Sequence, residues 1–134
     1  MKFLNRLLFL FFLFSNQVIA QDKKALQFFE KGKKDFMERN YESAVNNFNK
    51  YFEKDSSLQE AHFRMGQIYE SYKNQPKATF FYKNTIAKDT AKVNFVQAYT
   101  YLGSRALEKH EFEDAKKYLT VSLQNTNKNS IIYQ

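Results

Sequence analysis

The sequence predicts an all-α fold, an α-solenoid of three helical hairpins that contain six antiparallel helices. Three observations support this prediction. The chain of 134 residues has only three Gly and one Pro, which is too few for a protein dense in turns. Those three glycines recur at spacings of 34 and 37 residues, and an alanine follows each of them by 12 residues. The length suits one small domain.

Residues 1–20 are typical of a signal peptide. Lys2 and Arg6 give it a positive start, residues 7–14 form an unbroken apolar run, and Ala20 is the small residue before the predicted cleavage point. The alternative is a membrane anchor, but a spanning helix needs about 20 apolar residues. We therefore expect an exported protein, periplasmic or secreted, with no stable membrane span after cleavage.

The composition excludes several classes of site. The chain has no Cys, which excludes a disulfide framework, a thiol nucleophile and a lipidated N-terminal Cys. Its formal net charge is +7, and removal of Lys2 and Arg6 lowers it to about +5. Lys outnumbers Arg by 17 to 4, whereas nucleic-acid modules favour Arg for bidentate contacts. We therefore expect no nucleic-acid partner.

The six expected helices follow from apolar periodicity and from the breaks between them. We expect the first hairpin at residues 24–38 and 41–54, the second at 58–72 and 75–88, and the third at 92–109 and 112–125. Ser57 and Glu60 have the spacing of a capping box at the start of the third helix. Pro76 stands in the first turn of the fourth helix, where its missing N–H costs little.

The recurring glycines indicate close contact between the two helices of each hairpin. Gly inside a helix costs about 1 kcal/mol relative to Ala, so three such residues at one repeated position need a packing reason. We expect each glycine to be approached by the small alanine on the second helix. These alanines are Ala44, Ala78 and Ala115. Only a neighbouring hairpin could then cover the apolar face of each unit.

The repeated positions are occupied by Phe28, Gly32, Tyr41, Ala44 and Phe48 in unit one, by His62, Gly66, Tyr69, Ala78 and Tyr82 in unit two, and by Tyr99, Gly103, Ala115 and Leu119 in unit three. This pattern resembles the tetratricopeptide repeat (TPR), a helix–turn–helix family of 34-residue units. The resemblance implies repeats at 25–58, 59–92 and 96–129, followed by a short tail at 130–134.

The resemblance also implies a concave groove formed by the first helix of each repeat. By family position, the groove residues are Phe29, Lys33, Phe36, Phe63, Gln67, Glu70, Thr100, Ser104 and Leu107. Aromatic anchors with polar neighbours are typical of a peptide-binding groove. The alternative is that Phe29 and Phe36 only cap the N-terminal end of the array. The carboxylate clamp of chaperone adaptors in this family is not expected, because its Asn residues are missing.

Other chemistry-bearing residues have structural explanations. His62 and His110 are 48 residues apart and have no helical partner, so we expect no metal and no cofactor. Acids at the start of the last helix favour the positive end of its dipole. These acids are Glu111, Glu113 and Asp114. The aromatic residues expected in the core are Phe28, Phe48, Phe52, Tyr69, Tyr82, Tyr99 and Phe112.

The sequence thus predicts an exported TPR scaffold or adaptor that binds a protein or peptide in its groove, without catalysis. The alternative is a structural module that self-associates or docks in a cell-envelope complex through its open ends. Ile131, Ile132 and Tyr133 would then join a second copy, or would fold back over the last hairpin. A hydrolase with an unrecognised site is a third class, but no sequence motif supports it.

Overall fold

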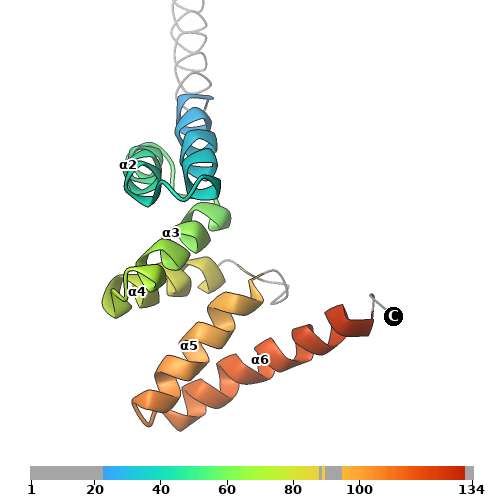
Figure 1. The fold of residues 1–134 in the computed structure, drawn as a ribbon. Helices are drawn as coiled ribbons and strands as arrows, with labels where there is room; N and C mark the ends of the chain where they lie inside the picture. The colour runs from blue at the N-terminus through green and yellow to red at the C-terminus, as the bar shows by residue number, and fades with distance from the viewer. Residues whose placement is uncertain (1–22, 88, 90–94, 132–134) are drawn as a thin grey trace, which may run out of the picture. The chain divides into compact units, whose positions relative to one another are not determined.

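The computed structural model describes residues 23–87, 89 and 95–131, and within them the fold is all-α with six helices and no strand. The first helix covers residues 23–37 and is blue in Figure 1. The others are α2 (Tyr41–Phe52), α3 (Gln59–Ser71), α4 (Gln75–Ala87), α5 (Val96–Glu108) and α6 (Phe112–Ile131). The predicted signal peptide, residues 1–20, lies outside the described residues.

The chain divides into two compact units, Met1–Ser57 and Leu58–Gln134, which we describe separately. The first unit contains the helix at residues 23–37 and α2. The second unit contains α3 to α6, in which α3 packs on α4, α4 on α5 and α5 on α6. Successive helices within each unit therefore pack against each other.

Each glycine lies against a large side chain on the partner helix of its pair. A Cβ atom built on the glycine would lie 2.8 Å from Phe48 at Gly32, 2.6 Å from Tyr82 at Gly66 and 2.6 Å from Leu119 at Gly103. The predicted close approach is confirmed. Its partner differs from the prediction, because the nearest atoms belong to the residue 16 positions after each glycine. The alanine 12 positions after each glycine is itself buried.

The turns inside the three pairs have the same backbone geometry. Arg39, Lys73 and His110 have positive φ angles of 60°, 56° and 60°. In the first turn, the backbone N–H of Asn40 donates to the carbonyl oxygen of Asp35 at 2.8 Å. The backbone N–H of Arg39 donates to the carbonyl oxygen of Phe36 at 3.0 Å. The same two bonds recur in the other turns. This is a Schellman motif, which satisfies helix-end carbonyl groups.

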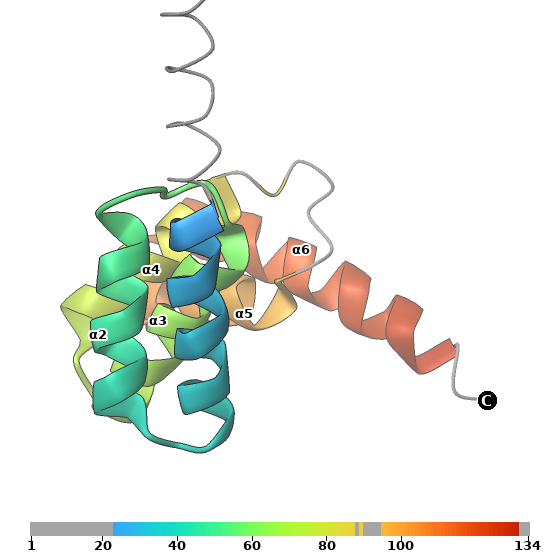
Figure 2. The ribbon, with the colours of Figure 1, turned by 90° about the horizontal axis from the view of Figure 1, so that it is seen from above.

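Several predicted helix limits are wrong. The last helix continues to Ile131 instead of ending near residue 125, so it contains the first two residues of the predicted tail. Figures 1 and 2 show α6 running on past α5. The fifth helix begins at Val96, not at residue 92. Ile132 and Tyr133 lie outside the described residues.

The predicted capping box at α3 is also wrong. Leu58 is the N-cap residue of α3, and it makes no side-chain capping bond. Ser57 instead donates its backbone N–H and its hydroxyl to the Asp55 carboxylate, at 2.8 Å and 3.0 Å. The Asp55 carboxylate therefore accepts both hydrogen bonds that Ser57 donates. Pro76 lies at the second residue of α4, as predicted.

The predicted core aromatics fall into three classes. Phe48, Tyr82 and Tyr99 are buried, which agrees with the prediction. Three others are half-buried, namely Phe28, Phe52 and Tyr69. Phe112 is 63% exposed, so its assignment to the core is wrong. It is the first residue of α6, where the helix has only just left the turn.

Candidate functional site

In the first unit, the structure places the predicted groove residue Phe29 in the core. Phe29 is only 4% exposed. Its ring centroid lies 6.2 Å from that of Phe48 and 5.8 Å from that of Tyr51. A side chain enclosed by two rings of its own unit offers no surface to a partner, so the prediction of Phe29 as a binding anchor is wrong.

Lys33 and Phe36 remain near the surface of the first unit. Both are half-buried. The Lys33 ammonium lies 3.6 Å from the Glu30 carboxylate and 5.4 Å from the centre of the Phe29 ring. The Phe36 ring lies 5.7 Å from that of Tyr41. The Lys33 contacts lie within the first helix, and the Phe36 contact joins that helix to α2.

In the second unit, the predicted residues Gln67 and Glu70 meet α5. Gln67 donates its side-chain N–H to the amide oxygen of Gln97 at 2.8 Å. Gln97 donates in turn to Glu70 at 3.3 Å. The Tyr82 hydroxyl also donates to Glu70, at 2.5 Å. We call Gln67, Glu70, Tyr82 and Gln97 the α3–α5 network, because it joins these two helices over the buried Tyr82.

Burial and the Glu70 carboxylate act together on Tyr82. Burial raises the pKa of its phenol far above the ordinary value, and the hydrogen bond to Glu70 raises it further. Tyr82 therefore stays neutral and keeps its proton as a donor. This fixes one oxygen of Glu70 and leaves the network with a defined arrangement of donors and acceptors.

Phe63 lies beside this network and is half-buried. Its ring centroid is 5.2 Å from that of Phe95 and 5.9 Å from that of Tyr82. The Arg64 guanidinium lies 5.9 Å from the centre of the Phe63 ring and donates to Gln67 at 3.2 Å. The predicted residues of α3 therefore share one surface, which combines an aromatic edge with fixed polar groups.

The predicted residues of α5 are exposed but only partly join this surface. Ser104 and Glu70 both line a pocket of about 290 Å³ at the turn end of α3 and α5. Lys73, Gln75, Tyr101, Arg105 and Glu108 complete this pocket, which we call the α3–α5 cleft. Thr100 shares a 2.6 Å hydrogen bond with Ser122 on α6. Neither Thr100 nor Leu107 lines the cleft.

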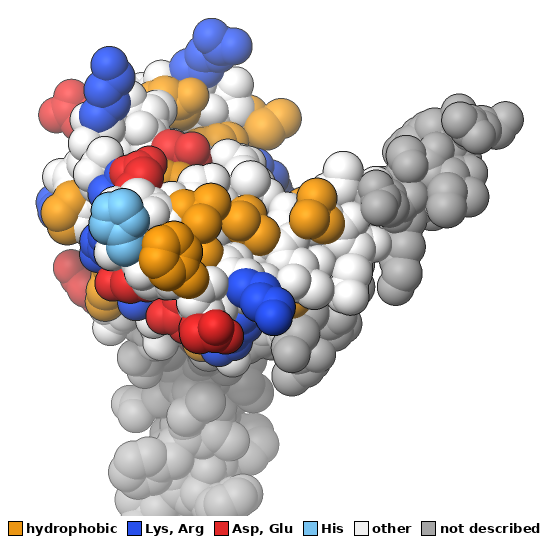
Figure 3. All heavy atoms as spheres, turned by 90° about the horizontal axis from the view of Figure 1, so that it is seen from below, with side chains coloured by type: hydrophobic (Ala, Val, Ile, Leu, Met, Phe, Trp, Pro, Cys, Tyr) orange, Lys and Arg blue, Asp and Glu red, His pale blue; other side chains and the backbone are white. Residues whose placement is uncertain are grey.

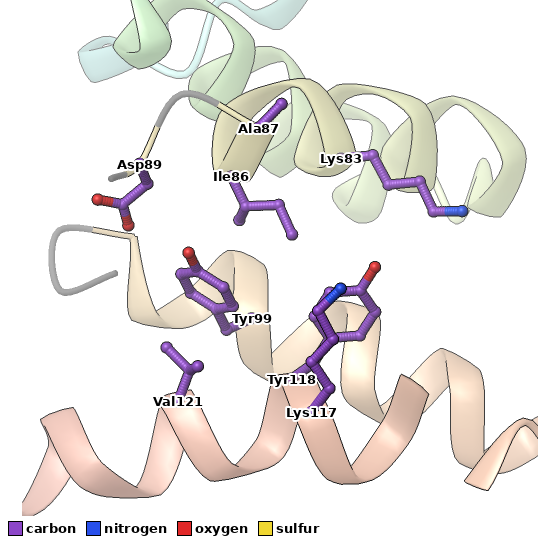
Figure 4. A pocket seen from close by; sticks show the side chains of 8 residues that line it. All are labelled: Lys83, Ile86, Ala87, Asp89, Tyr99, Lys117, Tyr118 and Val121. Atoms are coloured by element: carbon purple, nitrogen blue, oxygen red, sulfur yellow. The ribbon is translucent and has the colours of Figure 1, made fainter. Parts of the chain in front are cut away.

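A larger pocket, of about 550 Å³, lies elsewhere in the second unit (Figure 4). We call it the α4–α6 pocket, and its lining residues are Lys83, Ile86, Ala87, Asp89, Tyr99, Lys117, Tyr118 and Val121. The sequence did not predict this pocket. These residues come from three helices and the connection before α5, and no regular spacing relates them.

One end of the α4–α6 pocket holds a buried acid and a buried phenol. Asp89 and Tyr99 are each only 5% exposed. Burial is the largest cause that raises the pKa of Tyr99 to about 12, and the charge of the Asp89 carboxylate and a hydrogen bond to it add to the effect. Among the residues that the structure describes, the Oδ2 atom of Asp89 has no hydrogen-bond partner.

The described residues contain no group of three His, Asp or Glu side chains that could hold a metal ion. His62 is half-buried, with its ring 6.1 Å from that of Phe81. No helix in the described part of the chain is both long enough and apolar enough to span a membrane.

Apolar side chains gather on the face of the protein seen in Figure 3. Among the side chains that the structure describes on α5 and α6, the large apolar ones that are exposed are Leu107, Phe112 and Leu123.

Searches against family models, curated proteins and solved structures found no match to this chain.

Proposed function

We propose that this chain is an exported, TPR-like scaffold that recognises a segment of a protein partner and performs no chemistry. The repetition within the chain supports the proposal. Each of the three helix pairs has a glycine against a large side chain and the same two turn hydrogen bonds. Repeated pairs of this kind stack into solenoids whose extended surfaces bind other proteins.

The surface around the α3–α5 network is the proposed binding site, and the network is the observation that most favours it. Gln67, Glu70 and Gln97 are already connected by hydrogen bonds, so little side-chain entropy is lost when a partner binds. Phe63 supplies an aromatic contact beside them. The α3–α5 cleft, with Ser104 at its wall, extends the surface toward the turns.

A charge introduced into the cleft tests this proposal. Ser104→Lys places a long cation in the cleft, whereas Thr120→Lys places the same cation at another exposed position, on α6. We expect the Ser104 variant to capture its partner from envelope extract at least about tenfold less well than the unaltered protein. The Thr120 variant should capture it normally. Equal capture by both folded variants would reject the cleft as the binding site.

The alternative function, self-association through open ends, is favoured by the exposed Leu107, Phe112 and Leu123. Exposed apolar groups of this kind commonly mark contacts between proteins. Sedimentation over a range of concentrations distinguishes the two functions. Oligomers that dissociate in Leu123→Glu would support the alternative, and a monomer at every concentration would reject it.

A further inference from the structure

The α4–α6 pocket has opposite charges at its two ends. Asp89 and Tyr99 lie at one end, and Lys83 and Lys117 lie at the other (Figure 4). The acidic end is buried, whereas both lysines are exposed. A ligand that uses both ends would therefore place its cationic group inside the pocket and its anionic group at the surface.

One oxygen of the Asp89 carboxylate has no hydrogen-bond donor among the described residues. Tyr99 provides one hydrogen bond to the Asp89 carboxylate, but Oδ2 has no partner among the described residues. Buried polar atoms are nearly always hydrogen-bonded, so an unpartnered carboxylate oxygen indicates a missing donor. A primary ammonium group matches this need, because it supplies several N–H donors and an opposite charge.

The wall between the two ends is apolar. It is formed by Ile86 and Val121 together with the Tyr99 ring. The cationic end is formed by Lys83 and by Lys117, whose ammonium group lies 5.6 Å from the centre of the Tyr118 ring. Lysine ammonium groups attract a carboxylate. The pocket thus has a separate place for an ammonium group, for apolar atoms and for a carboxylate.

We propose that the α4–α6 pocket binds a small zwitterion of the amino-acid and dipeptide class. The ligand's ammonium group donates to Asp89, its apolar side chains contact Ile86 and Val121, and its carboxylate lies between Lys83 and Lys117. This site is distinct from the α3–α5 cleft and shares no lining residue with it. The inference therefore does not depend on the proposed scaffold function.

The dipeptide Leu-Leu and its two end-blocked forms test the proposal. Acetylation of Leu-Leu removes the ammonium charge, and amidation removes the carboxylate charge. The titration uses the chain without the predicted signal peptide, residues 1–20, and follows its amide NMR shifts. Leu-Leu should bind saturably with a Kd on the order of 1 mM or tighter. Each blocked form should bind about tenfold more weakly, because a charged group of the pocket then lacks its partner.

Variants identify the residue that recognises each end. Asp89→Asn should weaken Leu-Leu about tenfold and leave the acetylated form unchanged. Lys83→Gln with Lys117→Gln should remove the difference between Leu-Leu and its amide. Lys116→Gln, which changes the exposed lysine next to Lys117, is the matched control and should bind as the unaltered protein does.

Three results would overturn the proposal. They are the absence of saturable Leu-Leu binding to the folded protein, equal binding of all three peptide forms, and unchanged Leu-Leu binding in Asp89→Asn. Unfolding curves of each variant establish that it is folded. Because Asp89 Oδ2 has no hydrogen-bond partner among the described residues, Asp89→Asn should keep the fold.

Discussion

Asp35 in the first unit and Tyr69 in the second occupy equivalent positions, three residues after their glycines, but they join their helices differently. Asp35 accepts hydrogen bonds from Ser43 at 2.6 Å and from Asn47 at 2.8 Å, both on α2. The Ser43 bond is the largest cause that lowers the pKa of Asp35 below its ordinary value. The first pair is therefore joined at this point by a charged acceptor.

The residues 34 positions after Asp35, Ser43 and Asn47 form an aromatic contact instead. Tyr69 stacks on Phe81, with the ring centroids 5.6 Å apart and the planes 8° from parallel. The Lys77 ammonium lies 4.8 Å from the centre of the Tyr69 ring. One backbone arrangement thus accepts two kinds of contact. The difference teaches that the repeated glycine and turn determine the pairing, while the neighbouring side chains determine how it responds to pH and to mutation.

The largest expected effect distinguishes Phe29 from Phe63, which lie at equivalent positions in the two units. Phe29 is buried, so Phe29→Ala should lower the free energy of unfolding by about 3–5 kcal/mol. Phe63 is half-buried, so Phe63→Ala should cost less, about 1–3 kcal/mol. Denaturant unfolding measures both changes. A smaller loss for Phe29→Ala would contradict its assignment to the core.

Close helix contact predicts an unusual sign for a glycine substitution. Gly→Ala within a helix normally stabilises it. Gly66→Ala should instead lower the free energy of unfolding by about 1–3 kcal/mol, because the new Cβ would lie 2.6 Å from the Tyr82 ring.

In Gly32→Ala, the new Cβ would lie 2.8 Å from the Phe48 ring. We expect a smaller loss in the free energy of unfolding, because Phe48 has no counterpart of the hydrogen bond to Glu70 that holds Tyr82. Gln124→Ala, on the exposed face of α6, is the control that should be neutral or stabilising. If Gly66→Ala raised stability, the glycine would have no packing role.

The smallest expected effect concerns pH and only the first unit. Because the pKa of Asp35 is lowered by folding, its carboxylate stabilises the protein above the unfolded-state pKa, and this contribution is lost as the pH falls through the folded-state pKa. Asp35→Asn should cost about 1 kcal/mol at pH 7. The unfolding free energies of the two proteins should converge as the pH falls below the unfolded-state pKa of about 3.9 and through the lower folded-state pKa.

Urea unfolding at a series of pH values measures this convergence. Glu53→Gln, which removes one negative charge at an exposed position of the same unit, is the matched control. A difference between Asp35→Asn and the unaltered protein that stays constant down to pH 2 would show that the Asp35 charge has no role in stability.

The features predictable from the sequence were those that repeat. Gly32, Gly66 and Gly103 indicated close helix contact because glycine is unfavourable in helices. The breaks in apolar periodicity between the expected helices indicated the turns. All-helical structure in the described residues follows from these two signals. The partner of each glycine was mispredicted because spacing alone does not distinguish the alanine from the larger residue one helical turn later.

Features that depend on local competition or on distant residues were not predictable. Ser57 had two carboxylates within reach, and the sequence did not show that Asp55 would bind it. The end of α6 was placed too early, because the run after Asn125 is rich in residues with low helix propensity. Asp89 gave no signal, because its pocket is formed by side chains from three helices.

The three identical turns restrict where this chain can change in length. Each turn has three residues between its two helices, and its backbone hydrogen bonds close only at that length. One inserted residue there would rotate the second helix by about 100° and move Phe48, Tyr82 or Leu119 off its glycine. The three residues that lengthen the second spacing lie between Ala78 in α4 and Gly103 in α5, outside any such turn. Evolutionary insertions should therefore accumulate between pairs and spare their interiors.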